Sequence, residues 1–456
     1  MNTLLGGRWD RSLDRYPANA RRIWYLALAI IATITLYYET FTLASVAPLV
    51  QAEFHLSLSQ YVYCVVLANI LGALAALLGS LSDRIGRGNL IVFGLLVTGA
   101  CTLAMSLAAS LWPFLLLYWV LGFVQGMILT VTPALVRDFS PRLGRAAAMG
   151  FWTVGPVGGN FLAAIVASLT LPFYHNWHSQ YVIAGCAGVV VFLVCLVGLR
   201  ELSPALRDQV MNSLHDKTLI EARASRIDVE AALRHPWRQM LRPRLLINAL
   251  GINLFLLIYF VAKSFFVIYL STRFTFPLAQ ANGMVSVLFV VIVISSIVVG
   301  FLSDMMRVRK PFLLIGSTTL TIVTLLFISR IGQPTSAALM TVLLTLIGIC
   351  ISITFVPWVA AYTETVEDIN PALVATGIAI EVFISRLVAL FAILALPVVV
   401  GNGQGWGAWW WVCIAGQVVF LPTILTASGQ WNPARARAAA RARERAERLE
   451  AQPHVG

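Results

Sequence analysis

The chain has 456 residues, of which 59% are hydrophobic and only 11% are charged, and its formal net charge is +12. A soluble protein carries about 25% charged residues, so this composition excludes an ordinary soluble domain. A basic chain could bind nucleic acid, but the basic residues are distributed in a way that excludes that class, as described below.

Apolar runs follow one another along the whole chain, each near the roughly 20 residues that span a bilayer as a helix. We identify twelve, at roughly 23–47, 60–82, 89–108, 113–136, 146–170, 181–199, 245–270, 281–303, 311–329, 337–360, 372–397 and 407–427. Lipid offers backbone amides no hydrogen-bond partners, so these runs must be helical, and they lack the alternation of barrel strands. The sequence therefore predicts an all-α membrane protein with twelve transmembrane helices.

A short polar loop recurs at half the chain length. Gly79-Ser-Leu-Ser-Asp83 returns as Gly300-Phe-Leu-Ser-Asp304, so the offset is close to half of the chain. Such a repeat predicts two pseudo-symmetric six-helix halves. The expected domains are a cytoplasmic N-terminus (1–22), the N-terminal half (23–199), a cytoplasmic linker (200–244), the C-terminal half (245–430) and a basic cytoplasmic tail (431–456).

The basic residues gather on one side of the predicted membrane. Only four of the 32 Lys and Arg residues lie outside the termini, the linker and the loops after spans 2, 4 and 8, and these are Lys263, Arg273, Arg330 and Arg386. Positively charged loops stay in the cytoplasm, so both termini are predicted to be cytoplasmic and the protein to lie in the plasma (inner) membrane. This pattern explains the net charge without nucleic acid.

Cofactor and metal motifs are lacking in the sequence. All six cysteines fall in or next to apolar runs without a CxxC pair, and there is no Gly-x-x-x-x-Gly-Lys-Ser/Thr loop for a nucleotide. We therefore expect no metal, no cofactor and no enzymatic activity.

The first copy of the repeated loop has a more specific pattern. Its glycines permit close helix approach and a tight turn, and its acid lies at a helix end among arginines, where it can latch one conformation. The residues Gly79, Leu81, Asp83, Arg84, Gly86 and Arg87 closely match a signature of the major facilitator superfamily, and the whole chain resembles that family. The resemblance implies a transporter fold in which this loop latches the cytoplasmic gate. The second copy keeps Gly300 and Asp304 but lacks the later glycine.

A second latch is predicted after span 10. The acids Glu364, Glu367 and Asp368 could pair with Arg307, Arg309 or Lys310, and the alternative is a solvated loop. For the first loop, the alternative is that its charges only set the topology.

Span 1 contains Tyr37-Tyr38-Glu39, with Glu39 nine positions before Pro48. This stretch resembles the first helix of the aromatic-acid and organic-acid proton symporters, which implies that Glu39 takes part in proton coupling. Leu36 occupies the position where that branch usually has a second Asp. The Gly155-Pro156-Val-Gly158-Gly159 stretch of span 5 resembles, one residue short, a motif of drug/proton antiporters, and close helix packing is the alternative.

Charges inside a membrane cost at least about 2.5–3.5 kcal/mol and normally face a cavity. Glu39 and Lys263 lie at near-equivalent positions of the two halves, so we expect them to face one cavity and to pair when it is empty; for Lys263 the alternative is snorkelling to the interface. Glu381 and Arg386 lie about 140° apart on one helix and so should have separate partners. Lys263 and Arg386 favour an anionic substrate, and Glu381 either lines the substrate site or neutralises one of these cations. Softer candidates for substrate contact, each also explicable as helix packing, are Tyr37, Tyr38, Gln125, Asn160, Tyr259 and Trp358.

The sequence thus predicts a monomeric secondary active transporter that takes up a small organic anion together with protons. Glu39 would bind the proton, Lys263 and Arg386 would bind the anion, and Asp83 would latch the gate. The alternatives are an exporter of drugs or metabolites and, from a different class, a membrane receptor or sensor without transport.

Overall fold

The structure is a computed structural model that describes residues 11–76, 86–140, 145–203, 205–206, 236–370, 373–401 and 405–432. The latch residues Gly79, Asp83 and Arg84, most of the predicted linker and the tail after Asn432 lie outside the described residues.

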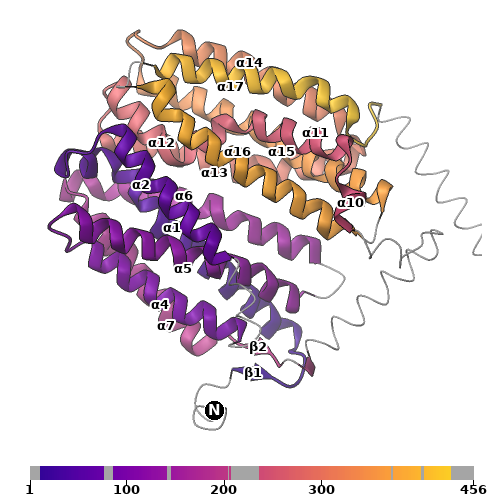
Figure 1. Ribbon diagram of the computed structural model, residues 1–456, viewed down its shortest axis with the longest axis horizontal. Helices are drawn as coiled ribbons and strands as arrows, with labels where there is room; N and C mark the ends of the chain where they lie inside the picture. The colour runs from indigo at the N-terminus through magenta and orange to yellow at the C-terminus, as the bar shows by residue number, and fades with distance from the viewer. Residues whose placement is uncertain are drawn as a thin grey trace, which may run out of the picture.

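The described chain contains twelve helices long and apolar enough to cross a membrane, which confirms the predicted fold class. They form two bundles that lie side by side (Figure 1). The first six spans are α1 (Asn19–Glu53), α2 (Leu58–Ala76), α4 (Arg87–Met105), α5 (Leu111–Asp138), α6 (Arg145–Tyr174) and α7 (His178–Gly198).

The seventh span is interrupted. It consists of α11 (Pro243–Phe255) and α12 (Leu257–Arg273), which meet at a turn at Leu256. The remaining elements are α10 (Pro236–Met240), α13 (Leu278–Met306), α14 (Lys310–Ser329), α15 (Ala337–Ile369), α16 (Val374–Val400), α17 (Trp406–Thr423) and the 3₁₀ turn η3 (Ile424–Thr426).

Polar side chains within the spans mostly form hydrogen bonds to backbone carbonyl oxygens of their own helix. The hydroxyl of Thr33 donates to the carbonyl oxygen of Ala29 at 2.8 Å, and Thr324 does the same to Leu320 at 2.8 Å. Such bonds to the preceding turn allow threonine and serine to remain helical in lipid, where an unsatisfied polar group is expensive.

A small parallel strand pair was not predicted from the sequence. β1 (Ser12–Leu13) pairs with β2 (Glu201–Leu202), which brings the N-terminal segment against the end of the sixth span. Arg11 strengthens this contact, because its Nη1 donates to the carbonyl oxygen of Cys195 at 3.0 Å. Two residues per strand give little periodicity, so no sequence pattern could have indicated the pair.

Among the described residues, the two halves share a hydrophobic core that includes their contact at one end. The side-chain amide of Asn282 in α13 donates to the carbonyl oxygen of Ser45 in α1 at 2.8 Å, and the rings of Tyr61 and Phe265 meet edge-on across the halves. A continuous buried cluster joins residues of both halves here, whereas a second cluster around Leu28, Leu95 and Leu135 belongs to the N-terminal half alone.

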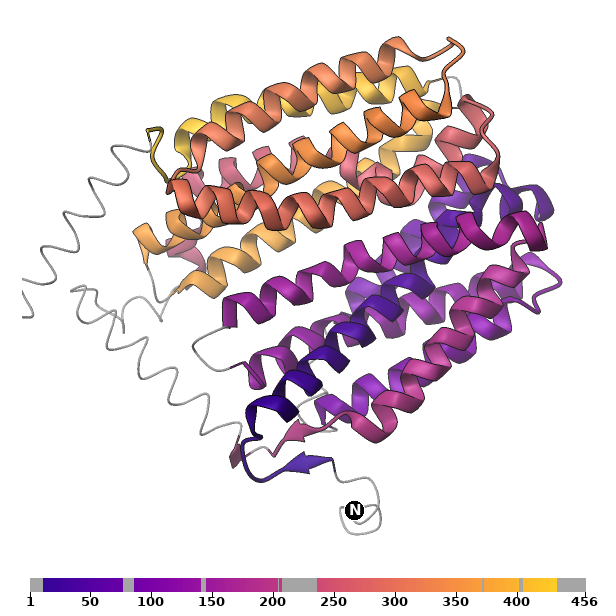
Figure 2. The same cartoon turned by 180° about the vertical axis from the view of Figure 1, so that it is seen from behind.

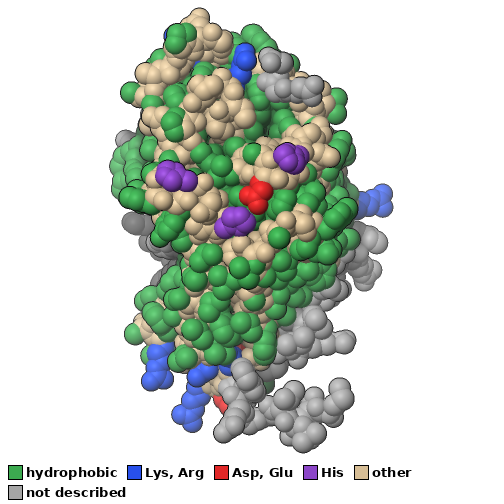
Figure 3. Space-filling view, turned by 90° about the vertical axis from the view of Figure 1, so that its left-hand side faces the viewer, with side chains coloured by type: hydrophobic (Ala, Val, Ile, Leu, Met, Phe, Trp, Pro, Cys, Tyr) green, Lys and Arg blue, Asp and Glu red, His purple; other side chains and the backbone are tan. Residues whose placement is uncertain are grey.

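We call the joined end the closed end. The opposite end, which holds Arg11, Arg87, Arg309 and the start of α11, is the basic end. Figures 1 and 2 show the ribbons of the two halves touching near the closed end and diverging toward the basic end. Figure 3 views the closed end, where lysine and arginine are sparse and histidine side chains surround an acidic one.

Candidate functional site

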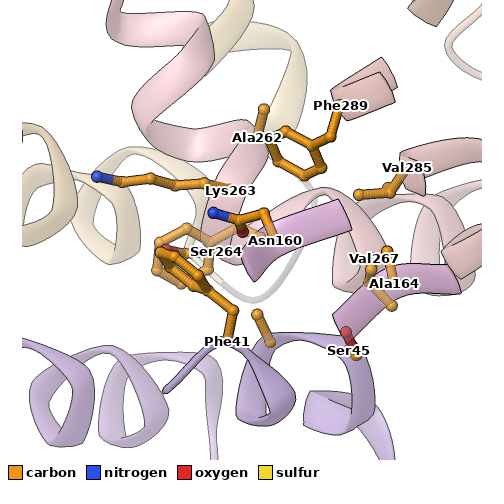
Figure 4. Close-up of a pocket in the computed structure, with 12 residues that line it drawn as sticks. Phe41, Ser45, Asn160, Ala164, Ala262, Lys263, Ser264, Val267, Val285 and Phe289 are labelled. Atoms are coloured by element: carbon orange, nitrogen blue, oxygen red, sulfur yellow. The ribbon is translucent and has the colours of Figure 1, made fainter. Parts of the chain in front are cut away.

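A cavity lies between the halves, toward the closed end. Its walls come from α1 and α6 of the first half and from α12 and α13 of the second (Figure 4). The side chains that define it are Phe41, Ser45, Asn160, Lys263, Val285 and Phe289. Because both halves contribute, any rocking of one half against the other changes the shape of this cavity.

Among the described residues, Lys263 is the only charged one in the wall of this cavity. Its side chain runs past Asn160, away from the apolar end formed by Val285 and Ala164 (Figure 4). The ammonium nitrogen lies 5.3 Å from the ring centroid of Phe260, and no described carboxylate forms an ion pair with it. Lys263 lines the cavity between the halves, and its ammonium nitrogen points away from the other labelled side chains (Figure 4).

Aromatic and cationic groups continue this surface. The rings of Tyr37 and Phe41 stack in parallel on α1, with centroids 5.8 Å apart and an interplanar angle of 11°. Tyr37 interacts electrostatically with Tyr259 and with the guanidinium of Arg386, both from the opposite half. The structure therefore brings Tyr37, Tyr259 and Arg386 together across the halves.

Two other predicted site residues, Trp358 and Glu381, make contacts within the C-terminal half. Trp358 is buried and stacks on Phe355 and Tyr362 along α15, with ring centroids 6.2 and 5.0 Å away. Glu381 of α16 interacts with Tyr362 and with the amide of Asn253 in α11. Glu381 thus has partners of its own in the C-terminal half, as expected for a residue that does not share a face with Arg386.

The position of Glu39 differs from the expectation. The structure does not bring it to Lys263: its side chain is 1% exposed and lies inside the N-terminal half, against Thr98 of α4 and Gly188 of α7. The reason is helical geometry, because a step of two residues turns a helix by about 200°. With Tyr37 toward the opposite half, Glu39 must point into its own bundle.

Three softer candidates also lie within the N-terminal half. The Gln125 side-chain amide donates to the carbonyl oxygen of Leu36 at 3.5 Å. Asn160 lines the cavity, but its amide donates to Pro156 of its own helix at 3.0 Å. Tyr38 is buried beside Ala163 and Ala184, and its hydroxyl has no hydrogen-bond partner among the described residues. Only Asn160 of these three contacts the cavity between the halves.

Ion pairs hold the basic end of each half. Arg87 Nη1 lies 2.5 Å from one oxygen of Asp138 and 2.7 Å from the other, and both side chains are at least nine-tenths buried. In the second half, Arg309 bonds Glu364 at 3.2 Å and Asp304 at 2.7 Å. The predicted pairing of Glu364 with this arginine is thereby confirmed.

The two ion pairs follow the internal repeat. Arg309 is the counterpart of Arg87 in the second half, and Glu364 is the counterpart of Asp138. Each counterpart lies further along the chain by nearly the spacing that separates the two copies of the polar loop. Sequence reasoning missed Asp138, although an acid among the arginines that follow span 4 was a usable signal. It also missed Glu201, whose Oε2 accepts from the backbone N–H of Gly88 at 3.2 Å in the first turn of α4.

Gly86, near the end of the first signature loop, has φ = 102°, a conformation that favours glycine. A side chain here would also collide with the carboxylate of Glu201. Gly300 has more room, because an added Cβ would make only an ordinary contact with Val356.

Twelve membrane-spanning helices in two bundles with a cavity between them are the architecture of a membrane transport protein. A family model described as Major Facilitator Superfamily matches residues 28–393, and the chain belongs to that family. It is therefore a multi-pass membrane protein.

Solved structures with the same fold include a D-xylose-proton symporter, with a TM-score of 0.67 and 14% identity over 89% of this chain and 97% of that one. Another is the inward open conformation of the xylose transporter XylE from E. coli, with a TM-score of 0.66 and 15% identity over 92% and 99% of the two chains. At such identities they show the fold alone.

Sequence relatives point in two directions. The chain is 29% identical to the multidrug efflux pump LfrA of Mycolicibacterium smegmatis, over 46% of this chain and 40% of that protein. It is also 29% identical to the 4-hydroxybenzoate transporter PcaK of Pseudomonas putida, over 36% of each chain. The matched segments span less than half the length of both relatives.

Proposed function

We propose that the protein takes up a small organic anion, a carboxylate, together with protons, across the plasma (inner) membrane with both termini in the cytoplasm. The observation that supports this most is Lys263, a cation in the wall of the cavity between the halves with no carboxylate partner among the described residues. A buried cation without a counter-ion is unfavourable unless a ligand supplies the negative charge.

The surroundings of Lys263 support a flat substrate. Phe41 lines the same cavity as Lys263 and its ring stacks on Tyr37, which interacts with Tyr259 and Arg386 of the other half. Arg386 has the planar fork that suits a carboxylate. A small carboxylic acid with an aromatic ring matches both the charge and the rings, in keeping with the named substrate of PcaK.

Proton coupling follows from Glu39, whose carboxyl group is buried without a cationic partner among the described residues. Protonating this group removes a negative charge from the half that the anion must contact. Proton and anion therefore favour each other's binding, as coupled ligands do.

The orientation rests on the basic end. It carries the described arginines of the N-terminal segment and of the loops after spans 2 and 8, which the positive-inside tendency assigns to the cytoplasm.

Binding of a carboxylate at Lys263 is tested by thermal stability of the purified protein. We expect 4-hydroxybenzoate to raise the melting temperature, whereas the uncharged 4-hydroxybenzamide does not. Lys263→Gln should abolish the shift, because a neutral side chain cannot attract the carboxylate. Lys310→Gln, at the basic end, is the matched control and should leave the shift intact. Stabilisation by both the acid and the amide contradicts the proposal. So does a lack of stabilisation by both compounds and by every other aromatic or aliphatic acid.

The second candidate is export of drugs or metabolites, favoured by the similarity to LfrA. It predicts stabilisation by a lipophilic cation such as tetraphenylphosphonium and no effect of acids. A receptor or sensor without transport predicts binding but no flux of any solute in proteoliposomes.

A further inference from the structure

Glu39 lies in a closed pocket between three helices of the N-terminal half. Gly188 of α7 forms its wall, because a Cβ built on this residue would overlap the carboxylate oxygen Oε1. The same Cβ would lie 3.1 Å from the Cα of Gly99 in α4. Two glycines thus let α4 and α7 approach closely and leave a notch that the end of the Glu39 side chain fills.

Among the described residues, the pocket offers the carboxyl group no cation. The Thr98 hydroxyl lies beside Glu39 and donates to the carbonyl oxygen of Leu95 at 3.3 Å. The other titratable groups that face Glu39 are Tyr38 on α1 and Cys101 on α4, and neither supplies a positive charge. Within the described part of the chain, neither oxygen of Glu39 has a hydrogen bond of normal geometry.

These surroundings suit the protonated form of Glu39. An ionised carboxylate here would be a buried charge without a cationic partner among the described residues, whereas a neutral carboxyl group carries no such charge. The proton held there is sealed from water in this conformation, since the side chain is 1% exposed.

The opposite face of α1 meets the substrate cavity. Tyr37 precedes Glu39 by two positions, or about 200° of rotation, and Phe41 lies one turn beyond Tyr37 on the same side, as their stacked rings show. Phe41 and Ser45 line the cavity, and Tyr37 interacts with Arg386 of the other half.

We propose that α1 binds the proton and the substrate on opposite faces, with Gly188 as the positioning residue that holds the Glu39 carboxyl group in its own pocket outside the cavity. The proton is taken from water onto a Glu39 oxygen and is returned to water when the helices part. A substrate then does not displace the proton from a shared site; the two communicate through the position of α1. This inference rests on the proposed proton coupling, but its test does not require transport.

The test is a double-variant cycle read by melting temperature and by infrared spectroscopy. We expect the wild-type protein to show the absorption of a protonated, buried carboxyl group and Glu39→Gln to lack one such band. Gly188→Ala should lower the melting temperature and remove the same band, because the added methyl group evicts the carboxyl group. Glu39→Ala in the Gly188→Ala background should restore most of the lost melting temperature.

The matched control is Gly158→Ala in α6. An added Cβ there would also face α1 but would lie 3.4 Å from Ile34, an ordinary contact, so little change is expected. If Glu39→Ala fails to rescue Gly188→Ala, the glycine serves only α4–α7 packing and the inference is wrong. A spectrum that Glu39→Gln leaves unchanged would overturn it as well. If the protein shows the Glu39 band and Glu39→Ala rescues Gly188→Ala, but the protein does not take up organic acids, only the proposed function is contradicted.

Discussion

At the residue scale, the two ion pairs of the basic end are equivalent in the repeat but not in environment. Arg87 and Asp138 are 9% and 2% exposed, whereas Arg309 and Glu364 are 15% and 41% exposed. Breaking a buried pair leaves an uncompensated charge, while an exposed pair contributes little. The same chemistry should therefore have different consequences in the two halves.

Asp138→Asn should lower stability substantially, because it removes the buried carboxylate that pairs with Arg87. The expected loss is about 3–5 kcal/mol. Melting temperature in detergent provides the measurement, and the double variant Asp138→Leu/Arg87→Leu should recover much of the loss.

Glu364→Gln is the symmetry-matched control, with an expected effect below about 1 kcal/mol. An equal drop in melting temperature for Asp138→Asn and Glu364→Gln would refute the argument from burial.

At the element scale, α13 packs on α6, α1 packs on α12, and one hydrogen bond joins α13 to α1 at the closed end. The Asn282 amide donates to Ser45 of α1 and also to Leu278 of its own helix at 2.9 Å. The bond to Ser45 exists only while the halves touch, so it stabilises one conformation relative to the other.

Asn282→Ala should shift the equilibrium away from the closed-end contact by about 1 kcal/mol, the usual net contribution of one hydrogen bond. Distance distributions between spin labels at Ser110→Cys and Gln333→Cys, in a background with Cys64→Ser and Cys186→Ser, should gain a longer component. Asn69→Ala is the matched control, since the Asn69 amide bonds Val65 of its own helix. An unchanged distribution in Asn282→Ala would mean that this bond does not hold the closed end.

At the scale of the whole molecule, the sequence was sufficient for the helices and their repeat. Long apolar runs follow from the physics of a chain in lipid, and the twelve described spans confirm the predicted helices. The symmetric pairing of Arg309 with Glu364 was also accessible, because opposite charges follow spans 8 and 10 at the same end.

The sequence did not reveal the direction in which each charged side chain within the spans points. The equivalence of Glu39 and Lys263 suggested one shared cavity, yet a difference of two positions on α1 separates the bundle interior from the inter-half surface. A small rotation of a helix decides such a placement, and that rotation depends on glycine contacts with other helices, such as Gly188 and Gly99. Contacts between distant segments have no local sequence pattern.

The central claim, proton-driven uptake of an organic anion, is tested most directly by flux in proteoliposomes with an imposed pH gradient. We expect labelled 4-hydroxybenzoate to accumulate on the alkaline side and the accumulation to disappear with a protonophore. Glu39→Gln should abolish accumulation but keep exchange of labelled for unlabelled acid, because a permanently neutral side chain allows the halves to rock while no proton is moved. Accumulation that survives in Glu39→Gln, or expulsion of a lipophilic cation with no movement of any organic acid, would contradict this account.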